Sequence, residues 1–136
     1  MTPRSKVRFT PVQKEVIERM RGELLEAARS GEVMTYGHLM QRYRFSRGRA
    51  LSRAIGEVDV MESRAGAPGF AAIIVRKDTR LPGGGFFVGP DIPRALARRR
   101  ERGSDPKLTR DEESYVRREQ KTIWEFYSRD RRRSSG

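Results

Sequence analysis

Three threonines in this chain each stand immediately before a segment with a helical pattern of apolar residues. Thr10 is followed by a proline and then by Gln13, which is the arrangement of a capping box. Thr35 precedes a short amphipathic segment, and Thr109 is followed three residues later by Glu112, in a second capping box. An N-cap side chain satisfies free amides of the first helical turn, so these positions predict helix starts. The chain is therefore expected to be mainly helical.

The spacing of apolar residues predicts two helices in the first third of the chain. Over residues 11–29, apolar side chains recur every three or four positions, which indicates one buried stripe that ends before Gly31. The members of this stripe are Val12, Val16, Ile17, Met20, Leu24 and Ala28. A short helix is predicted over residues 36–43, with Leu39 and Met40 buried.

A third helix is predicted over residues 47–59, after a tight connection at residues 45–46. Its inward-facing residues are expected to be Ala50, Leu51, Ala54, Ile55 and Val58. Two short helices joined by a brief turn form a helix-turn-helix pattern.

The segment that follows predicts β-structure. Residues 70–75 form an apolar run of strand length, rich in β-branched residues toward its end. Residues 81–85 (LPGGG) predict a mobile hairpin turn, because glycine supplies the positive φ that such turns need, and residues 86–88 predict the returning strand. The predicted fold class is therefore mainly α with a small β-hairpin: a winged helix-turn-helix plus a C-terminal helical extension.

The composition divides the chain into three parts. Residues 1–89 are expected to form the winged-helix domain, residues 90–128 a helical extension, and residues 129–136 (RDRRRSSG) a disordered basic tail. Within the extension, the sequence predicts a short helix around residues 93–101 and a longer final helix. The apolar stripe of that final helix consists of Tyr115, Val116, Ile123, Trp124 and Tyr127. It is expected to dock on the domain, and the alternative is a protein partner or a homodimer formed through the Trp124 helix.

The charge of the chain favours a polyanionic partner. Lysine and arginine number 30 against 18 acids, which gives a net charge of +12, and the alternative is a charge excess that serves solubility alone. The absence of cysteine excludes thiol catalysis and disulfides, a single histidine cannot build a zinc site, and no cofactor is expected. No apolar run approaches the length of a membrane span and the N-terminus lacks a signal-peptide core, so a cytoplasmic, nucleoid-associated protein is expected.

The basic residues gather in two places. Five arginines fall between residues 42 and 53 without one acid, and Arg49 and Arg53 share a helix face with Ser52 beside them. Like charges at this spacing repel, which is explicable if a polyanion neutralises them. Residues 76–80 form a polar segment of the predicted wing, in which Arg76, Lys77 and Arg80 could hold phosphates, and Tyr36 stands at a helix start, where amides and a hydroxyl suit phosphate. The predicted DNA-binding residues are Tyr36, Arg42, Arg47, Arg49, Ser52, Arg53, Arg76, Lys77 and Arg80.

The segment from Phe9 through Gly56 resembles the C-terminal winged-helix domain of the alkylguanine-DNA alkyltransferases and their non-enzymatic alkyltransferase-like relatives. The family has a phenylalanine before the first helix, a G-x-V-x-T-Y-G segment and a recognition helix that contains R-A-V-G. The matching pieces here are Phe9, residues 31–37 (GEVMTYG) and residues 53–56 (RAIG). They follow one another in the same order and at similar spacing.

The resemblance implies that Tyr36 contacts the phosphate of a target nucleotide and that Arg53 enters the base stack in place of a flipped base. The family's next motif, P-C-H-R, carries the cysteine that accepts the alkyl group. Residues 67–72 (APGFAA) occupy that neighbourhood here, and they contain neither the cysteine nor the histidine. A thiolate nucleophile is therefore impossible.

These observations predict a protein without enzyme activity that binds double-stranded DNA through an arginine-rich recognition helix and a basic wing. The alternative is an interaction or inhibitor protein, of the kind encoded by phages and mobile elements, that uses its basic face on an acidic protein surface. A third possibility is a nuclease with a metal held by Glu57, Asp59, Glu62 and Asp78, although their spacing does not point to a metal.

Overall fold

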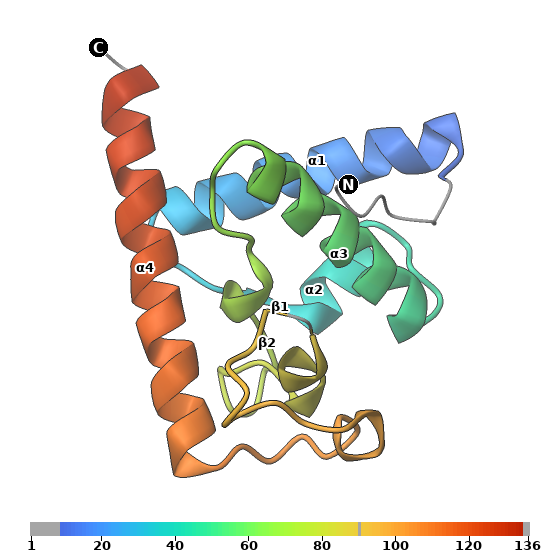
Figure 1. Ribbon diagram of the computed structural model, residues 1–136. Coiled ribbons are helices and arrows are strands. Elements are labelled where there is room, and N and C mark those ends of the chain that lie inside the picture. Colours follow the sequence, from blue (N-terminus) through green and yellow to red (C-terminus); the bar gives the residue numbers. More distant parts are fainter. Residues whose placement is uncertain (1–8, 90, 135–136) are drawn as a thin grey trace.

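The computed structural model describes residues 9–89 and 91–134. In these two stretches the chain is mainly helical, with a small sheet of two parallel strands (Figure 1). The predicted mainly helical class is confirmed. The elements in chain order are α1 (Pro11–Arg29), β1 (Met34–Thr35), α2 (Tyr36–Arg42), α3 (Gly48–Arg64), η1 (Ala71–Ile73), β2 (Ile74–Val75), η2 (Gly84–Val88), η3 (Arg100–Arg102) and α4 (Arg110–Ser134), where η denotes a 3-10 helix.

Both predicted capping boxes are present. The Thr10 hydroxyl accepts a hydrogen bond of 3.2 Å from the Gln13 amide, and the Gln13 side chain accepts one of 2.8 Å from the Thr10 amide. Thr109 and Glu112 make the same reciprocal pair at 3.1 Å and 2.8 Å. Each pair satisfies two amides at a helix start, so α1 and α4 begin where the sequence predicted.

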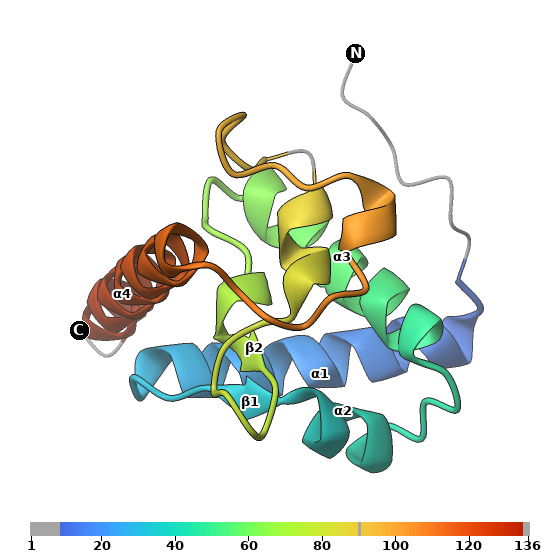
Figure 2. The same ribbon diagram turned by 90° about the horizontal axis from the view of Figure 1, so that it is seen from below.

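The main core lies between α1, α3 and α4. Met20 and Leu24 of α1, Val58 of α3 and Tyr127 of α4 are all almost completely buried. The Tyr127 ring stacks on Phe70 with ring centroids 5.0 Å apart. Figures 1 and 2 both show the C-terminal half of α1 running up against α4. The predicted docking of the final helix on the domain is confirmed.

A buried carboxylate joins the three long helices. Glu62 of α3 is only 3% exposed, and it accepts a hydrogen bond from the guanidinium of Arg21 in α1. Its second oxygen lies 2.9 Å from the hydroxyl of Tyr127 in α4. Burial and this carboxylate both raise the pKa of the Tyr127 hydroxyl. A buried charge that is paired and hydrogen-bonded in this way holds its neighbours in one arrangement, because breaking the pair would leave it uncompensated.

The predicted β-hairpin is wrong. Only Ile74 and Val75 of the apolar run are a strand, and they pair in parallel with Met34 and Thr35 of β1. Residues 86–88 belong to the 3-10 helix η2 instead of a returning strand. Phe87 in η2 is fully buried and packs in a second small core with Leu81 and Val116, which an extended hairpin tip could not provide.

Four further expectations differ from the structure. Helix α3 continues to Arg64, because the polar Glu62 finds buried partners that sequence spacing does not reveal. Ala50, expected inside, is exposed. Around residues 93–101 there is no α-helix, only turns and the start of η3. Helix α4 runs through Ser134, so the tail expected to be disordered is helical as far as it is described. Residues 110–134 contain no Gly or Pro, and arginine is a good helix former. Residues 135–136 lie outside the described residues.

Candidate nucleic-acid interface and pocket

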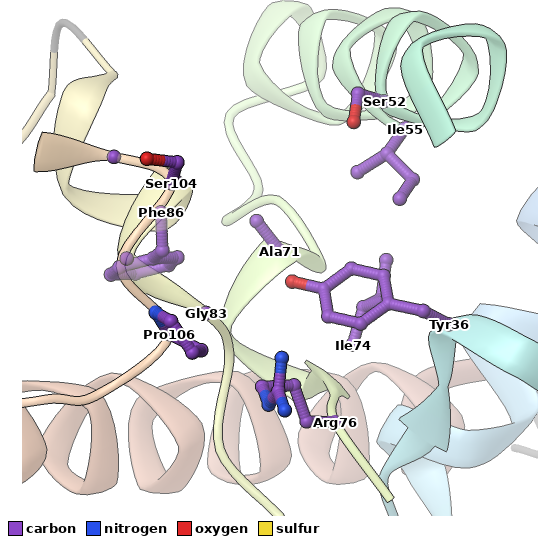
Figure 3. A pocket seen from close by; sticks show the side chains of 13 residues that line it. Tyr36, Ser52, Ile55, Ala71, Ile74, Arg76, Gly83, Phe86, Ser104 and Pro106 are labelled. Atoms are coloured by element: carbon purple, nitrogen blue, oxygen red, sulfur yellow. The ribbon is translucent and has the colours of Figure 1, made fainter. Parts of the chain in front are cut away.

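A cavity of about 400 Å³ opens between α2, α3, β2 and two segments nearer the C-terminus (Figure 3). Ser52 and Ile55 reach it from α3, and Tyr36 from the first turn of α2. On the opposite side, as Figure 3 shows, stand Phe86 and Ser104. The full lining consists of Tyr36, Ser52, Ile55, Ala71, Ile74, Arg76, Gly83, Gly84, Gly85, Phe86, Gly103, Ser104 and Pro106.

Tyr36 is placed by a cap and by a strand pair. The Thr35 hydroxyl accepts a hydrogen bond of 3.1 Å from the His38 amide, which starts α2 at Tyr36 as predicted. Thr35 also pairs with Val75 in the sheet, so that the next residues, Tyr36 and Arg76, both reach the cavity. Figure 3 shows the Tyr36 hydroxyl pointing into it. Burial raises the pKa of this hydroxyl, against a hydrogen bond from the Gly83 amide and the nearby Arg76 charge, which lower it.

The outer face of α3 is basic and lined with small residues. Leu51, Ala54, Ile55 and Val58 are buried at helical spacing, which turns Arg49, Ser52 and Arg53 outward. Gly48, Ala50 and Gly56 on the same half of the helix are also exposed. Because these residues carry at most one methyl group, another molecule can approach the helix backbone closely between the arginine side chains.

Two of the predicted arginines already have acidic partners. The Arg42 guanidinium lies 2.9 Å from the Glu23 carboxylate, which also accepts hydrogen bonds from Tyr43 and His38 at 2.6 Å each. These partners lower the pKa of Glu23 although desolvation raises it. With three such partners the Glu23 carboxylate stays charged, so Arg42 offers less net positive charge than the sequence suggested.

Arg76 is the second paired arginine. Its guanidinium donates two hydrogen bonds, of 3.0 and 2.8 Å, to Asp78 within a tight turn. The turn is closed by a hydrogen bond of 2.9 Å from the Arg76 amide to the Leu81 carbonyl. Lys77 and Arg80 are exposed on it, and Arg80 adopts a left-handed φ of 61°. The turn therefore presents two exposed cations, Lys77 and Arg80, around the internal ion pair of Arg76 and Asp78.

The structure brings three of the predicted site residues together and leaves the others around them. Tyr36, Ser52 and Arg76 line the cavity, whereas Arg53 is exposed beside Ser52 without lining it. Arg47 is exposed at the N-cap position of α3, two residues before Arg49.

Sequence reasoning missed the far wall of the cavity. Phe86 and residues 103–106 were not singled out, because nothing local to them indicates a site. The one signal was the triple glycine at 83–85, which was interpreted as a mobile turn. Gly84 is in fact buried, and a Cβ there would collide with the Asp105 carbonyl and with Arg98.

The four acids of the nuclease hypothesis do not converge. Asp59 accepts a hydrogen bond of 2.7 Å from the Phe70 amide, Glu62 bonds with Arg21 and Tyr127, and Asp78 bonds with Arg76. Over the described stretches, no group of three or more His, Cys, Asp or Glu residues could hold a metal ion.

Within the same stretches, none of the helices combines the length and apolarity that crossing a membrane demands.

No protein-family model, curated protein or solved structure matches this chain. Its function is therefore inferred from the geometry and chemistry of the residues themselves.

Proposed function

We propose that this chain is a non-enzymatic protein that binds double-stranded DNA through α2 and α3, acting as a helix-turn-helix unit similar to that of the alkyltransferase-like winged helix. The observation that carries the proposal is the outer face of α3. From Gly48 to Gly56 this face holds Arg49, Ser52 and Arg53, small residues between them and no acid. Such a surface suits a groove, where arginine reads base edges and a close backbone approach is needed.

The phosphate contacts come from both sides of α3. Arg47 at its start, and Lys77 and Arg80 in the turn at 76–81, are exposed cations that suit the backbone on either side of the groove. This turn takes the place of the wing expected from the sequence. Arg42 and Arg76 contribute more weakly, because Glu23 and Asp78 already neutralise part of their charge.

The cavity beside α3 supports a second part of the proposal, that a base swung out of the duplex enters it. Its volume of about 400 Å³ lies in the range of small-molecule sites. Tyr36 and Ser52 supply hydroxyls, and Phe86 and Ile55 supply apolar surface, which are the hydrogen-bonding and stacking groups that hold an extruded base. Arg53, exposed and next to Ser52 in the sequence, is the residue proposed to fill the vacated stack.

Binding without chemistry is proposed because of what lines the cavity. The lining contains no thiol, imidazole or carboxylate, so it offers no nucleophile paired with a base. Ala71 reaches it from residues 67–72, the neighbourhood in which the alkyltransferases carry their cysteine. An alanine there can contact a base but cannot accept an alkyl group.

The proposal is tested by fluorescence anisotropy with a labelled duplex between 50 and 200 mM salt. With five or more phosphates neutralised, the binding constant should fall by about two to three decades over this range. Heparin, a polyanion without bases, and single-stranded DNA and RNA of the same length are the controls. Binding that is indifferent to salt, or no tighter to duplex than to heparin at equal charge, would refute duplex recognition and favour an acidic protein as the partner. Cleavage of the duplex with Mg²⁺ would refute the non-enzymatic assignment.

A further inference from the structure

The most heavily bonded cation among the described residues is Arg98, which lies outside every predicted site. Its side chain is 6% exposed. Two of its N–H groups bond to the two Glu112 oxygens, each at 2.6 Å. The other three bond to the main-chain carbonyls of Arg102 and Asp105 at 2.9 Å and of Lys107 at 2.7 Å. All five guanidinium donors are therefore used.

These bonds fix a segment with little regular structure. Residues 99–107 contain only the short 3-10 helix η3. Yet Gly103, Ser104 and Pro106 from this segment line the cavity, and Figure 3 shows Ser104 and Pro106 on the side that faces Tyr36. The three carbonyls that accept hydrogen bonds from Arg98 lie on both sides of these residues. One buried side chain therefore fixes the position of residues 99–107, which form the outer wall of the cavity and are called the wall below.

The wall is also in tight contact with η2. A Cβ on Gly84 would overlap the Asp105 carbonyl and the Arg98 guanidinium, and a Cβ on Gly103 would lie 2.6 Å from Val88 Cγ2. Such contacts are possible only for glycine, so both segments have the residue that close packing requires. The wall therefore has a defined position against η2.

Glu112 connects this wall to α4. Its carboxylate belongs to the capping box with Thr109 and at the same time receives the Arg98 pair. Hydrogen bonds from Arg98 lower the pKa of Glu112, so the pair stays charged at neutral pH. Because α4 packs into the main core, the wall is anchored to the rigid part of the molecule.

We infer that Arg98 is a positioning residue that fixes the wall at 99–107 and thereby keeps the cavity in the shape that accepts an extruded base. This inference rests on the proposed function. The side chain is covered by its own bonds, so it acts through the placement of Gly103, Ser104 and Pro106 and does not contact DNA. A wall displaced by about 1 Å is enough to lose the discrimination of a pocket.

The test compares affinities for an intact duplex and for a duplex with one central mismatch, at one salt concentration. A mismatched base costs less to extrude, so the wild type should prefer the mismatch by about tenfold. Arg98→Lys keeps the charge but cannot make the five planar bonds. Arg98→Met with Glu112→Gln removes the pair without leaving a buried charge, and glutamine still serves the capping box. Arg94→Lys, at an exposed arginine of the same extension, is the matched control.

Both Arg98 variants should bind the intact duplex within about twofold of the wild type and lose most of the preference, to a ratio of about one to three. Partial unfolding lowers both affinities by the same factor and leaves the ratio unchanged, so the ratio isolates the role of the wall. Arg94→Lys should keep the wild-type ratio. A preference that persists in both Arg98 variants overturns the inference alone. A wild type without any preference overturns the base-accepting cavity and the inference with it, and a wild type that does not bind duplex overturns the proposed function as a whole.

Discussion

The indole Nε1 of Trp124 in α4 donates a hydrogen bond of 2.9 Å to the main-chain carbonyl of Glu32. Glu32 lies just before β1, the strand that leads directly into Tyr36. Helix α4 therefore holds the segment that positions the cavity's tyrosine, although the two are far apart in the sequence. This contact and the Arg98–Glu112 pair attach both sides of the cavity to the same helix.

Trp124→Phe should lower the free energy of unfolding by about 1–2 kcal/mol, because it removes this hydrogen bond and part of the packing on the core. Urea unfolding followed by circular dichroism measures the change. Thr122→Ala, at an exposed position of the same helix, should shift it by less than about 0.5 kcal/mol. Equal stabilities of Trp124→Phe and the wild type would show that the indole does not contribute to docking.

Arg53→Ala should weaken duplex binding by about 1–3 kcal/mol, since this exposed arginine follows Ser52 on the α3 face proposed to enter the groove. Arg64→Ala removes the same charge from the far end of α3 and should cost less than about 1 kcal/mol. Anisotropy titrations at one salt concentration compare the two. If both substitutions cost the same, α3 is only part of a general electrostatic surface.

Tyr36→Phe should lower affinity for the mismatched duplex by about three- to tenfold and change intact-duplex affinity less. Burial raises the pKa of this hydroxyl, so it remains protonated through neutral pH and can donate a hydrogen bond to a base or phosphate. The phenylalanine ring keeps the apolar contacts, and the melting temperature serves as the control for the fold. An unchanged mismatch affinity would remove Tyr36 from the site.

Gly84→Ala should destabilise the protein, whereas Gly85→Ala should not. At Gly84 the added methyl collides with the Asp105 carbonyl and Arg98, and overpacking of this kind costs about 1–3 kcal/mol. At Gly85 the nearest atom, the Gly103 carbonyl oxygen, lies 3.8 Å away, so alanine fits and should be neutral or stabilising by about 0.5 kcal/mol. Thermal unfolding of the pair checks this, and equal melting temperatures would contradict the close approach of η2 and the wall.

Asp59 should make the wild type lose stability as the pH rises. Burial raises the pKa of the Asp59 carboxyl to about 6. The hydrogen bond from the Phe70 amide lowers the pKa, and the negative charges of Glu62 and Asp91 raise it further. The folded state binds this proton more tightly than the unfolded chain, whose aspartate titrates near pH 4. The stability that Asp59 contributes is therefore complete below about pH 4 and lost as the pH rises through about 6.

Asp59→Asn keeps an acceptor oxygen for the Phe70 amide and cannot ionise. The difference in unfolding free energy between variant and wild type should therefore grow between pH 4 and pH 7 and reach about 1–2 kcal/mol in favour of the variant. Glu15→Gln, at an exposed carboxylate of α1 that does not act on Asp59, controls for the loss of one negative charge. A difference that is constant with pH would show that Asp59 titrates normally.

Features set by neighbouring residues could be predicted, and features set by distant ones could not. The caps at Thr10, Thr35 and Thr109 act within three residues, so sequence spacing places α1, α2 and α4 correctly. Tyr36 and Ser52 could be selected because a helix start and a helix face are local properties.

The prediction of a hairpin was wrong because this part of the fold depends on contacts between distant residues. The pairing of β1 with β2 and the burial of Phe87 under α4 depend on residues far away in the sequence. The same holds for the outer wall of the cavity. From the sequence alone, residues 103–106 resemble a polar linker, because their position depends on the pairing of Arg98 with Glu112. The one local signal was Gly84, where only glycine allows residues 103–106 to pack so closely.

The packing of α1 on α4 also has a consequence for how the protein is made. Helix α1 leaves the ribosome well before α4, and at about 5–20 residues per second the delay lasts several seconds. Until Ile123 and Tyr127 have emerged, Met20 and Leu24 lack part of their cover. The nascent chain therefore exposes apolar surface on which chaperones can act. The α3 surface is held in its final arrangement only after translation has delivered α4, so the partner binding that we propose for this surface would depend on completion of that helix.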